Sequence, residues 1–333
     1  MKKLFLLGLS GILLTACAPK TAKQTEFMLD TICTITIYEE KNKEKTADEL
    51  IEEAFELCSG YEDMLSRTIE GSDIYKLNNS GGTPVEVSDD TMEILEAAKR
   101  YSELSDGAFD ITTAPLSILW DFEGEDPHVP PEDQIQAMTE KIDYTKIKID
   151  GNTVTLEAPV EAIDLGAIAK GYIADRTADY LRENGVTSAY ISLGGNLYAI
   201  GSNSQEKRPF RLGIQDPKST DGSIIGYVEV SDKSLVTSGD YQRFFEEDGK
   251  RYHHILDPET GYPTDNGLSS VTIVSDKSLD GDALSTACFV LGLDDGMKLI
   301  NSLDGIEAVF IDSSNEIYLS DGFGKTIEFY DAE

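Results

Sequence analysis

A short segment near the middle of the chain combines a carboxylate, a glycine and a lysine in an order that suits anion binding. It runs from Ile163 to Tyr172 and contains Asp164, Gly166 and Lys170. The pattern predicts a strand end, a glycine turn and the first turn of a helix, where free backbone N–H groups can contact phosphate oxygens. Asp164 fits equally well as a structural residue at a helix start, so the segment alone leaves both hypotheses open.

A second segment, Gly281 to Thr286, places Asp282 and Thr286 four residues apart and therefore on one face of a predicted helix. A carboxylate beside hydroxyl groups can hold a hard cation such as Mg²⁺, which prefers oxygen ligands and phosphate partners. The same residues also make a plain helix cap with a solvated polar face, and for this segment alone the cap is the simpler interpretation.

Two of the three histidines, His253 and His254, stand side by side before a turn rich in proline and glycine. Histidine is a natural general base near neutral pH. Neighbouring residues of a strand point to opposite faces, so we expect the two imidazoles to have different roles and not to form a zinc pair.

The stretch from Asp106 to Thr112 reads as a glycine turn that leads into a buried segment. An aromatic ring at Phe109 could cover a planar ligand. A phenylalanine in such a segment is more often part of the hydrophobic core.

Taken together and in order, these segments resemble the ApbE family of FAD:protein FMN transferases. The family pattern includes a G-x-F-D-x-T stretch, D-L-G-x-x-A-K-G, a G-G-N loop, T-S-G-x-Y, H-I-x-D-P-x-T-G-x-P and D-A-L-S-T, and the chain carries all of them in that order. The resemblance covers about residues 25–330. It implies an α+β fold of the ApbE type, related to the T-fold, with bound FAD and Mg²⁺.

The resemblance also implies roles for single residues. The flavin contacts match Asp164, Lys170, Ala108, Phe109, Asp110 and Ile255, and the metal ligands match Asp282, Thr286, Ser285 and the backbone carbonyl of Ala167. Two positions depart from the family. Leu29 takes the place of a methionine, and Thr68 takes the place of a tyrosine that stacks on the flavin, so Tyr61, Tyr75 or a partner side chain is left to cover the ring.

The family chemistry transfers FMN from FAD to a threonine or serine hydroxyl of an acceptor flavoprotein, with AMP as leaving group. That acceptor would be a subunit of a membrane redox complex or an extracellular FMN-binding domain. His254 is the candidate general base for that hydroxyl, and Asp257 is the candidate to orient it. A cation and Lys170 would offset the charge of the diphosphate. An FAD pyrophosphatase and a non-catalytic flavin-binding lipoprotein remain alternatives.

The elements that must position these residues alternate helices and strands without a regular βαβ rhythm. Apolar spacing predicts helices over about residues 46–65, 89–104, 168–182, 282–291 and 296–301. Residues 146–149 and 153–157 flank an Asp-Gly-Asn turn and predict a hairpin. No linker follows residue 26. We therefore expect one composite α+β domain over residues 26–333.

The first residues predict a targeting segment. Lys2 and Lys3 precede an apolar run that is too short to span a bilayer, and a small residue then precedes Cys17. We interpret residues 1–16 as a lipoprotein signal peptide, Cys17 as the lipidated residue and residues 17–25 as a tether. This would hold the domain at the cell membrane on the extracytoplasmic side. The alternative is an ordinary signal peptide in which Cys17 has no role.

The net charge and the remaining cysteines limit the kinds of ligand and site that the chain can have. The formal net charge is -34, which disfavours nucleic acid because phosphate binding depends on Lys and Arg. An anionic ligand would need a metal ion or locally concentrated donors. Cys33, Cys58 and Cys288 lie far apart in apolar segments, so we expect buried free thiols and no zinc or redox motif.

Overall fold

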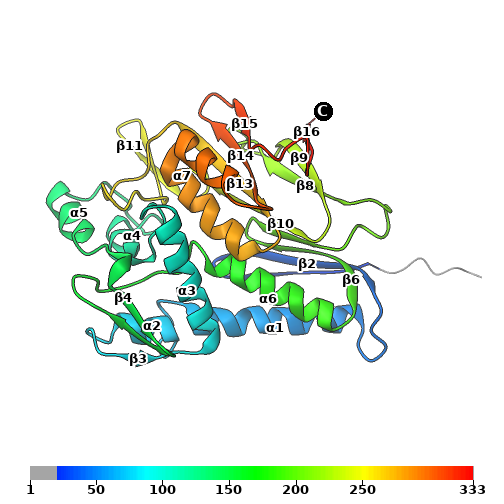
Figure 1. Cartoon of the computed structure of the whole chain (residues 1–333), viewed down its shortest axis with the longest axis horizontal. Coiled ribbons are helices and arrows are strands. Elements are labelled where there is room, and N and C mark those ends of the chain that lie inside the picture. Colours follow the sequence, from blue (N-terminus) through cyan, green and yellow to red (C-terminus); the bar gives the residue numbers. More distant parts are fainter. Residues whose placement is uncertain (1–20, 333) are drawn as a thin grey trace, which may run out of the picture.

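The computed structural model describes residues 21–332. Its centre is a sheet of eight strands in which all neighbours are antiparallel (Figure 1). In spatial order these strands are β1 (Ala22–Met28), β2 (Thr31–Glu40), β6 (Val186–Leu193), β7 (Asn196–Ile200), β10 (Lys233–Gly239), β13 (Leu268–Ser275), β14 (Glu307–Asp312) and β15 (Ile317–Leu319).

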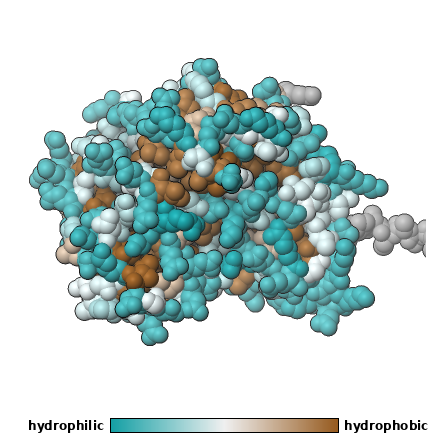
Figure 2. All heavy atoms as spheres, viewed as in Figure 1, coloured by the Kyte–Doolittle hydropathy of each residue, from teal (hydrophilic) through white to brown (hydrophobic). Residues whose placement is uncertain are grey.

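Three long helices cover one face of this sheet: α1 (Ala47–Leu65), α6 (Ala169–Glu183) and α7 (Ser278–Asn301). Their apolar side chains form the main core with inward residues of the sheet such as Ile35 and Ile191. A three-stranded sheet of β8 (Phe210–Gln215), β9 (Ile224–Val230) and β16 (Phe329–Asp331) packs on the other face through a second core. Hydrophilic residues cover most of the face shown in Figure 2, in keeping with the acidic composition.

The amphipathic helices begin where the sequence predicts. Thr46 and Glu49 form a reciprocal capping box at the start of α1. Ser88 caps α3 (Asp89–Leu104), whose bounds agree with the predicted helix. The predicted hairpin is also confirmed, as β4 (Ile147–Asp150) and β5 (Thr153–Leu156), with β3 (Val85–Glu86) on the other edge of β5.

Helix α7 differs from its prediction. The structure joins the two predicted helices into one element with a break at Gly292, where φ is +80° and ψ is −179°. The helix also begins four residues before Asp282, because Lys277 already has extended backbone angles and ends the preceding loop. Asp282 therefore lies inside the helix and does not cap it.

The remaining helices form a subdomain at one end of the molecule. They are α2 (Asp73–Asn78), α4 (Ala114–Trp120), α5 (Glu132–Thr139) and the 3₁₀ turns η1 (Ile111–Thr113) and η2 (Tyr144–Lys146). Trp120 is the centre of an aromatic cluster that includes Phe245 and Tyr252 of the hairpin β11 (Phe244–Glu247) and β12 (Lys250–His253). The Trp120 indole donates to the carbonyl oxygen of Gly261 at 2.9 Å, which fixes the turn that follows the histidines.

The predicted tether needs a correction. Strand β1 begins at Ala22 and pairs with β2 from Ala22 to Met28, so residues 22–25 belong to the sheet and not to a tether. Their polar composition comes from the exposed surface of this edge strand, where alternate side chains face water. Cys17 and the predicted signal peptide lie outside the described residues.

The fold is a single α+β domain, as predicted. Cys33, Cys58 and Cys288 are buried free thiols, which confirms the interpretation of their sequence surroundings. Within residues 21–332, no helix has the length and apolar character needed to cross a membrane.

Candidate functional site

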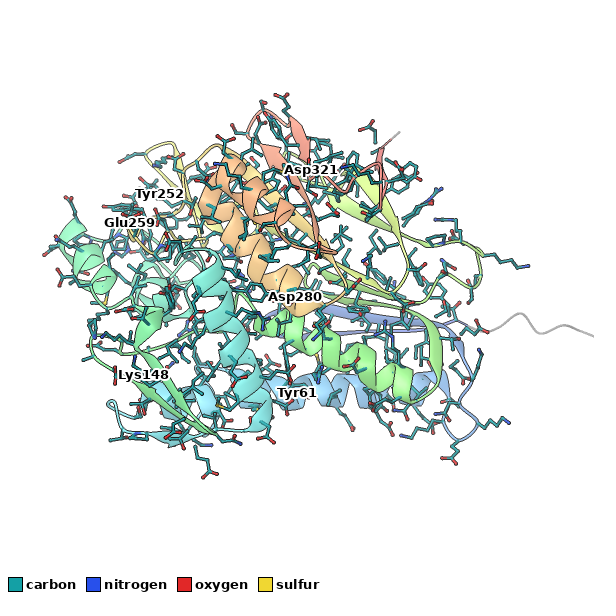
Figure 3. All side chains as sticks on the ribbon, viewed as in Figure 1. Tyr61, Lys148, Tyr252, Glu259, Asp280 and Asp321 are labelled. Atoms are coloured by element: carbon teal, nitrogen blue, oxygen red, sulfur yellow. The ribbon has the colours of Figure 1, made fainter. Side chains whose placement is uncertain are left out.

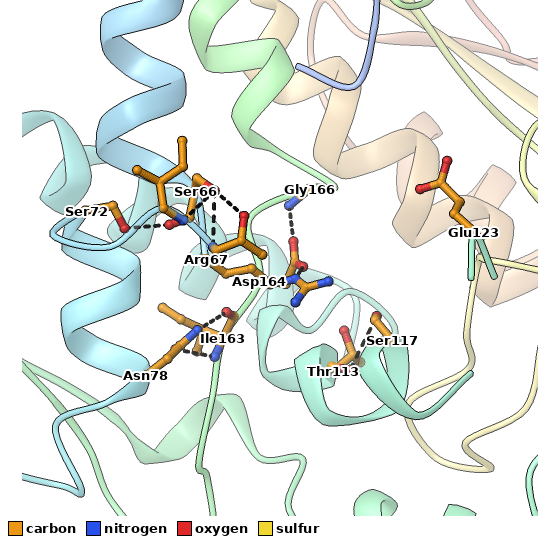
Figure 4. A network of polar contacts seen from close by, with 12 residues as sticks. Ser66, Arg67, Ser72, Asn78, Thr113, Ser117, Glu123, Ile163, Asp164 and Gly166 are labelled. Atoms are coloured by element: carbon orange, nitrogen blue, oxygen red, sulfur yellow. Dashed lines mark hydrogen bonds and ion pairs between the residues drawn. The ribbon is translucent and has the colours of Figure 1, made fainter. Parts of the chain in front are cut away.

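The turn between β5 and α6 joins Asp164 to Arg67, an arginine that no sequence motif singled out. Asp164 Oδ1 accepts from the Gly166 N–H at 2.6 Å, and Asp164 Oδ2 accepts from Arg67 Nε at 2.6 Å (Figure 4). Arg67 follows the C-terminus of α1, so this ion pair connects two segments that are far apart in the sequence. Both side chains are half-buried. Asp164 therefore shapes the turn and also holds a cation beside it.

Lys170 lies in the first turn of α6 and folds back on the same glycine turn. Its Nζ donates to the carbonyl oxygen of Gly166 at 3.0 Å, and the side chain is half-buried. The positive charge of Lys170 is close enough to lower the pKa of His254. The glycine turn therefore lies within electrostatic range of the histidine segment.

Asp282 contacts the same turn from the opposite helix. The carboxylate is buried, and Oδ2 accepts from the Gly171 N–H at 2.8 Å. In a regular helix that N–H would donate to the carbonyl oxygen of Ala167. Within residues 21–332 no N–H donor occupies the Ala167 carbonyl. Asp282 therefore leaves a backbone oxygen available at the start of α6.

Hydroxyl groups gather one helical turn farther along α7. Ser238 Oγ of β10 lies 2.8 Å from Ser285 Oγ and 3.3 Å from Thr286 Oγ1. Ser285 is fully buried, whereas Thr286 is partly exposed. Asp282, Ser285 and Thr286 are thus grouped on α7 beside the β10 hydroxyl, as their helical spacing predicts.

This set of oxygen atoms suits a hard cation that also contacts a ligand. No group of three or more His, Cys, Asp or Glu side chains that could hold a metal occurs in the described part of the chain. One carboxylate, neutral hydroxyls and a backbone carbonyl would leave coordination positions for phosphate oxygens, which is the way proteins commonly bind Mg²⁺. The free carbonyl of Ala167 is the observation that fits such a role best.

The two histidines differ in their surroundings, although strand alternation does not explain it, because β12 ends at His253 and His254 lies in the bend that follows. His253 is buried, its Nε2 pairs with the Thr264 carbonyl oxygen at 2.9 Å, and its ring packs edge-on against Phe289. His254 is half-buried, and its Nδ1 lies 3.3 Å from the Arg243 carbonyl oxygen. Burial lowers the pKa of both imidazoles. For His254, burial together with the nearby cation of Arg243 lowers the pKa to about 3, so the ring is neutral at physiological pH.

Asp257 has a structural role in the turn. Its Oδ1 accepts from the Glu259 N–H at 2.8 Å, its Oδ2 accepts from Thr260 Oγ1 at 3.0 Å, and its backbone pairs with Gly261 and Tyr262. The expectation that Asp257 orients the reaction is therefore not supported by its contacts. The group that fixes the His254 ring is the Arg243 carbonyl.

The Gly107 turn places Phe109 in the core, which is the interpretation that the residues alone favoured. The Phe109 ring is 1% exposed and packs against Tyr101 in the core. Asp110 accepts from Thr112 and from the Tyr144 N–H at 3.0 Å, and burial raises its pKa. Ala108 remains partly exposed. Any ligand contact from Phe109 would come from its backbone, because its side chain belongs to the core.

Three further expected contacts lie around the site. Leu29 is partly buried at the β1–β2 turn, where its N–H donates to Glu62 Oε1 at 2.9 Å. Thr68 is exposed and lies directly after Arg67. The Ile255 side chain is buried in the main core, so its exposed contact surface is small.

Tyr61 is not available to cover a ligand ring. Its hydroxyl donates to Asp90 at 3.4 Å and its ring packs edge-on against Tyr172; Figure 3 shows it on α1. Tyr75 on α2 is partly exposed. The planar guanidinium of Arg67, next to Thr68, is the group that sequence reasoning missed, and no motif in the sequence pointed to it.

Comparisons with known proteins identify the family of the chain. The family model described as "ApbE family" matches residues 29–310. A FAD:protein FMN transferase of Klebsiella pneumoniae is 39% identical over 81% of this chain and 84% of its own length. One of Treponema pallidum is 34% identical over 93% of this chain and 89% of its own.

Solved structures show the same fold. The ApbE protein of Thermotoga maritima superposes with a TM-score of 0.84 at 32% identity, over 94% of this chain and all of that one. The flavin transferase ApbE of Vibrio cholerae gives a TM-score of 0.82 at 29% identity, over 92% and 98% of the two chains.

Proposed function

The chain belongs to the ApbE family of flavin transferases, and from this premise we propose that it transfers the FMN half of FAD to a threonine or serine hydroxyl of an acceptor protein, releasing AMP. The observation that carries the proposal is the contact of the Asp282 carboxylate with the first turn of α6, where the Ala167 carbonyl has no backbone donor and Lys170 folds back on the glycine turn. These groups provide oxygen ligands and a cation at one turn, and the charge of Lys170 also acts on the neutral imidazole of His254.

The proposed reaction is a displacement at phosphorus. The acceptor hydroxyl oxygen forms a bond to the phosphorus of the FMN half, and the bond from that phosphorus to the oxygen of AMP breaks. The hydroxyl proton moves to Nε2 of His254. The Arg243 carbonyl can only accept, so His254 carries its hydrogen on Nδ1 and its lone pair on Nε2.

The residues that would hold Mg²⁺ are Asp282, Thr286, Ser285 and the carbonyl of Ala167. A bound Mg²⁺ would stabilise negative charge on the phosphoryl oxygens and on the AMP leaving group. Lys170 and Arg67 supply positive charge near the same turn. This local charge matters because a protein of net charge -34 otherwise repels a diphosphate.

The low pKa of His254 suits this ligand. In the free protein the imidazole is neutral but a weak base. A diphosphate bound near it would favour the imidazolium ion, because a nearby opposite charge stabilises the charged form. We therefore infer that FAD binding raises the pKa of His254 and so makes it a stronger base in the enzyme–substrate complex.

We also propose that Cys17 carries a lipid and holds the enzyme at the extracytoplasmic side of the cell membrane. The order of basic, apolar and small residues before Cys17 supports this. The acceptor would then be a flavoprotein in the same compartment, either a redox-complex subunit or an FMN-binding domain.

Incubation with FAD and Mg²⁺, with and without an acceptor protein, tests the reaction. We expect AMP and a covalently flavinylated acceptor in equal amounts. AMP and free FMN in the absence of acceptor would instead show a pyrophosphatase. No AMP under either condition would refute the proposed chemistry.

A further inference from the structure

Helices α6 and α7 each supply a carboxylate that binds N–H groups in the first turn of the other. Asp282 of α7 accepts from the Gly171 N–H of α6 at 2.8 Å. In the reverse direction, Asp175 of α6 accepts from the N–H groups of Ser278 and Leu279 at 2.7 and 3.0 Å, which are the first two residues of α7. Each helix thus supplies an acceptor for the unpaired N–H groups of the other.

Asp175 replaces the usual cap of α7. The residue before the helix is Lys277, whose side chain makes no capping hydrogen bond. The first N–H groups of a helix need acceptors, and they are normally satisfied by the side chain just before it. Asp175 meets this need from a neighbouring helix while being only 8% exposed. Burial raises the pKa of its carboxyl to about 7, which shows that keeping a charge there is costly.

The contact between the helices leaves little room for adjustment. A Cβ atom at Gly171 would lie 2.4 Å from the Ser278 carbonyl oxygen and 2.7 Å from the Leu279 Cα. The start of α7 is therefore held by Asp175 on one side and by direct backbone packing against α6 on the other. Asp282 follows Leu279 by three residues, less than one helical turn.

We propose that Asp175 is a positioning residue, which fixes the first turn of α7 so that the Asp282 carboxylate and the Ala167 carbonyl oxygen stand at the spacing that a divalent cation requires. The inference rests on the proposed function, because it assigns that cation to the same site. Asp175 itself bonds to backbone N–H groups and is not one of the cation's ligands.

The test uses Asp175→Asn, which keeps the shape and one acceptor oxygen, and Asp175→Ala, which removes both. Binding of Mn²⁺ to the full chain is measured by electron paramagnetic resonance with ADP present, and the Mg²⁺ concentration for half-maximal transfer is measured separately. We expect both variants to weaken Mn²⁺ binding by about tenfold or more, as is typical when groups that orient metal ligands are lost. Excess Mg²⁺ should restore most transfer.

Asp73→Asn is the matched control. Asp73 is also buried, and it accepts from the Ser88 N–H at 2.8 Å and from Thr91 Oγ1 at 2.9 Å at the start of α3. It should lower stability without changing the affinity for Mn²⁺. If Asp175→Asn folds and binds Mn²⁺ as tightly as Asp73→Asn, the positioning role is wrong. If the wild-type enzyme transfers FMN without any divalent cation, it is the proposed function that fails.

Discussion

His254 and Arg243 are joined twice through one oxygen atom. The His254 backbone N–H donates to the Arg243 carbonyl oxygen at 3.0 Å, and the His254 Nδ1 lies 3.3 Å from the same oxygen. Both contacts need a hydrogen on the histidine side, since a carbonyl only accepts. The ring is thus held in the tautomer whose Nε2 can take a proton, by a backbone group and without a carboxylate partner.

Replacing His254 should separate binding from chemistry. We expect His254→Ala and His254→Gln to bind FAD nearly as well as the wild type and to lose about a hundredfold to ten-thousandfold in transfer rate. His253→Gln is the matched control, because His253 only braces the turn through the Thr264 carbonyl. Single-turnover transfer rates decide the matter, and a His254→Gln rate close to wild type would end the general-base proposal.

The pH dependence of transfer should also differ from that of an enzyme whose general base is a histidine with the usual pKa. Burial and the Arg243 cation hold the His254 pKa near 3 in the free enzyme, so its neutral form persists well below the usual histidine range of about 6.5. Plots of kcat/KM against pH should therefore show no loss of activity between about pH 7 and 5 that is due to this group. A loss centred near pH 6.5 that disappears in His254→Gln would contradict this assignment.

Asp282 should be needed for both the metal and the fold of the site. Asp282→Asn retains an oxygen for the Gly171 N–H but removes the charge, so it should fold and lose most transfer activity and Mg²⁺ dependence. Asp282→Ala also leaves a buried N–H without an acceptor, at a cost of about 1–3 kcal/mol. Asp280→Asn is the control, because it changes a charge in the same helix (Figure 3) at a carboxylate that accepts from the Tyr101 hydroxyl. Wild-type transfer by Asp282→Asn in EDTA would rule out the metal site.

The sequence predicted the long elements because their apolar spacing is strong. The helices at 47–65 and 89–104 were placed to within a residue, since each begins at a side-chain cap and buries one regular stripe. The short helices α2, α4 and α5 were not predicted. Each has only six to eight residues, too few for a periodic pattern. The apolar side chains of α2 pack in the main core, and those of α4 and α5 pack around Trp120.

The sequence identified most residues of the candidate site but predicted their roles less well. Motif order identified Asp164, Lys170 and Asp282, which all contact the turn at residues 166–171, and His254, on which the charge of Lys170 acts. Phe109 lies in the core, as its residue type favoured, whereas the direction of the Asp257 side chain was not readable, and its contacts lie within its own turn. Arg67 was missed because an ion pair between residues 97 positions apart leaves no local pattern.

Gly171 should not tolerate a side chain. Gly171→Ala would put a Cβ atom 2.4 Å from the Ser278 carbonyl oxygen, and backbone on both sides would have to move. We expect a loss of about 1–3 kcal/mol in the free energy of unfolding, as is usual for overpacking. The Mg²⁺ concentration needed for half-maximal transfer should rise as well. Gly60→Ala on α1 has no atom within 4 Å of the new Cβ and should stabilise the protein by about 0.5–1 kcal/mol. Equal urea midpoints for the two variants would show that the helices have more room than their contact suggests.

Removal of the proposed lipid site should release the enzyme. We expect the Cys17→Ala protein to leave the membrane fraction while its transfer rate with a soluble acceptor stays unchanged, because Cys17 lies outside the described domain, which holds all of the proposed site residues. Cys58→Ala, which alters a buried thiol that contacts Thr177, should remain with membranes. Fractionation followed by immunoblotting measures both. Continued membrane association and normal processing of Cys17→Ala would argue for an ordinary signal peptide.

Asp175 should give stability an unusual dependence on pH. Burial raises its folded pKa to about 7 from an ordinary value of 3.8, the nearby Asp280 adds to the rise, and Lys277 and the two helix N–H groups oppose it. Between these two pH values the folded protein holds a proton that the unfolded chain releases. The contribution of Asp175 to the free energy of unfolding is therefore largest below about pH 4 and declines as pH rises through 7.

Comparison with Asp175→Asn isolates this effect, because asparagine does not titrate and all other groups, including the histidines, are common to both proteins. Urea unfolding at pH 5 and pH 8 should show that the stability of the wild type relative to Asp175→Asn is greater at pH 5. The expected sign is opposite to that of a carboxylate in an ion pair, whose contribution is lost as pH falls. A difference that stays constant, or that grows toward pH 8, would mean that the helix N–H groups outweigh burial and that Asp175 is an ordinary charged cap.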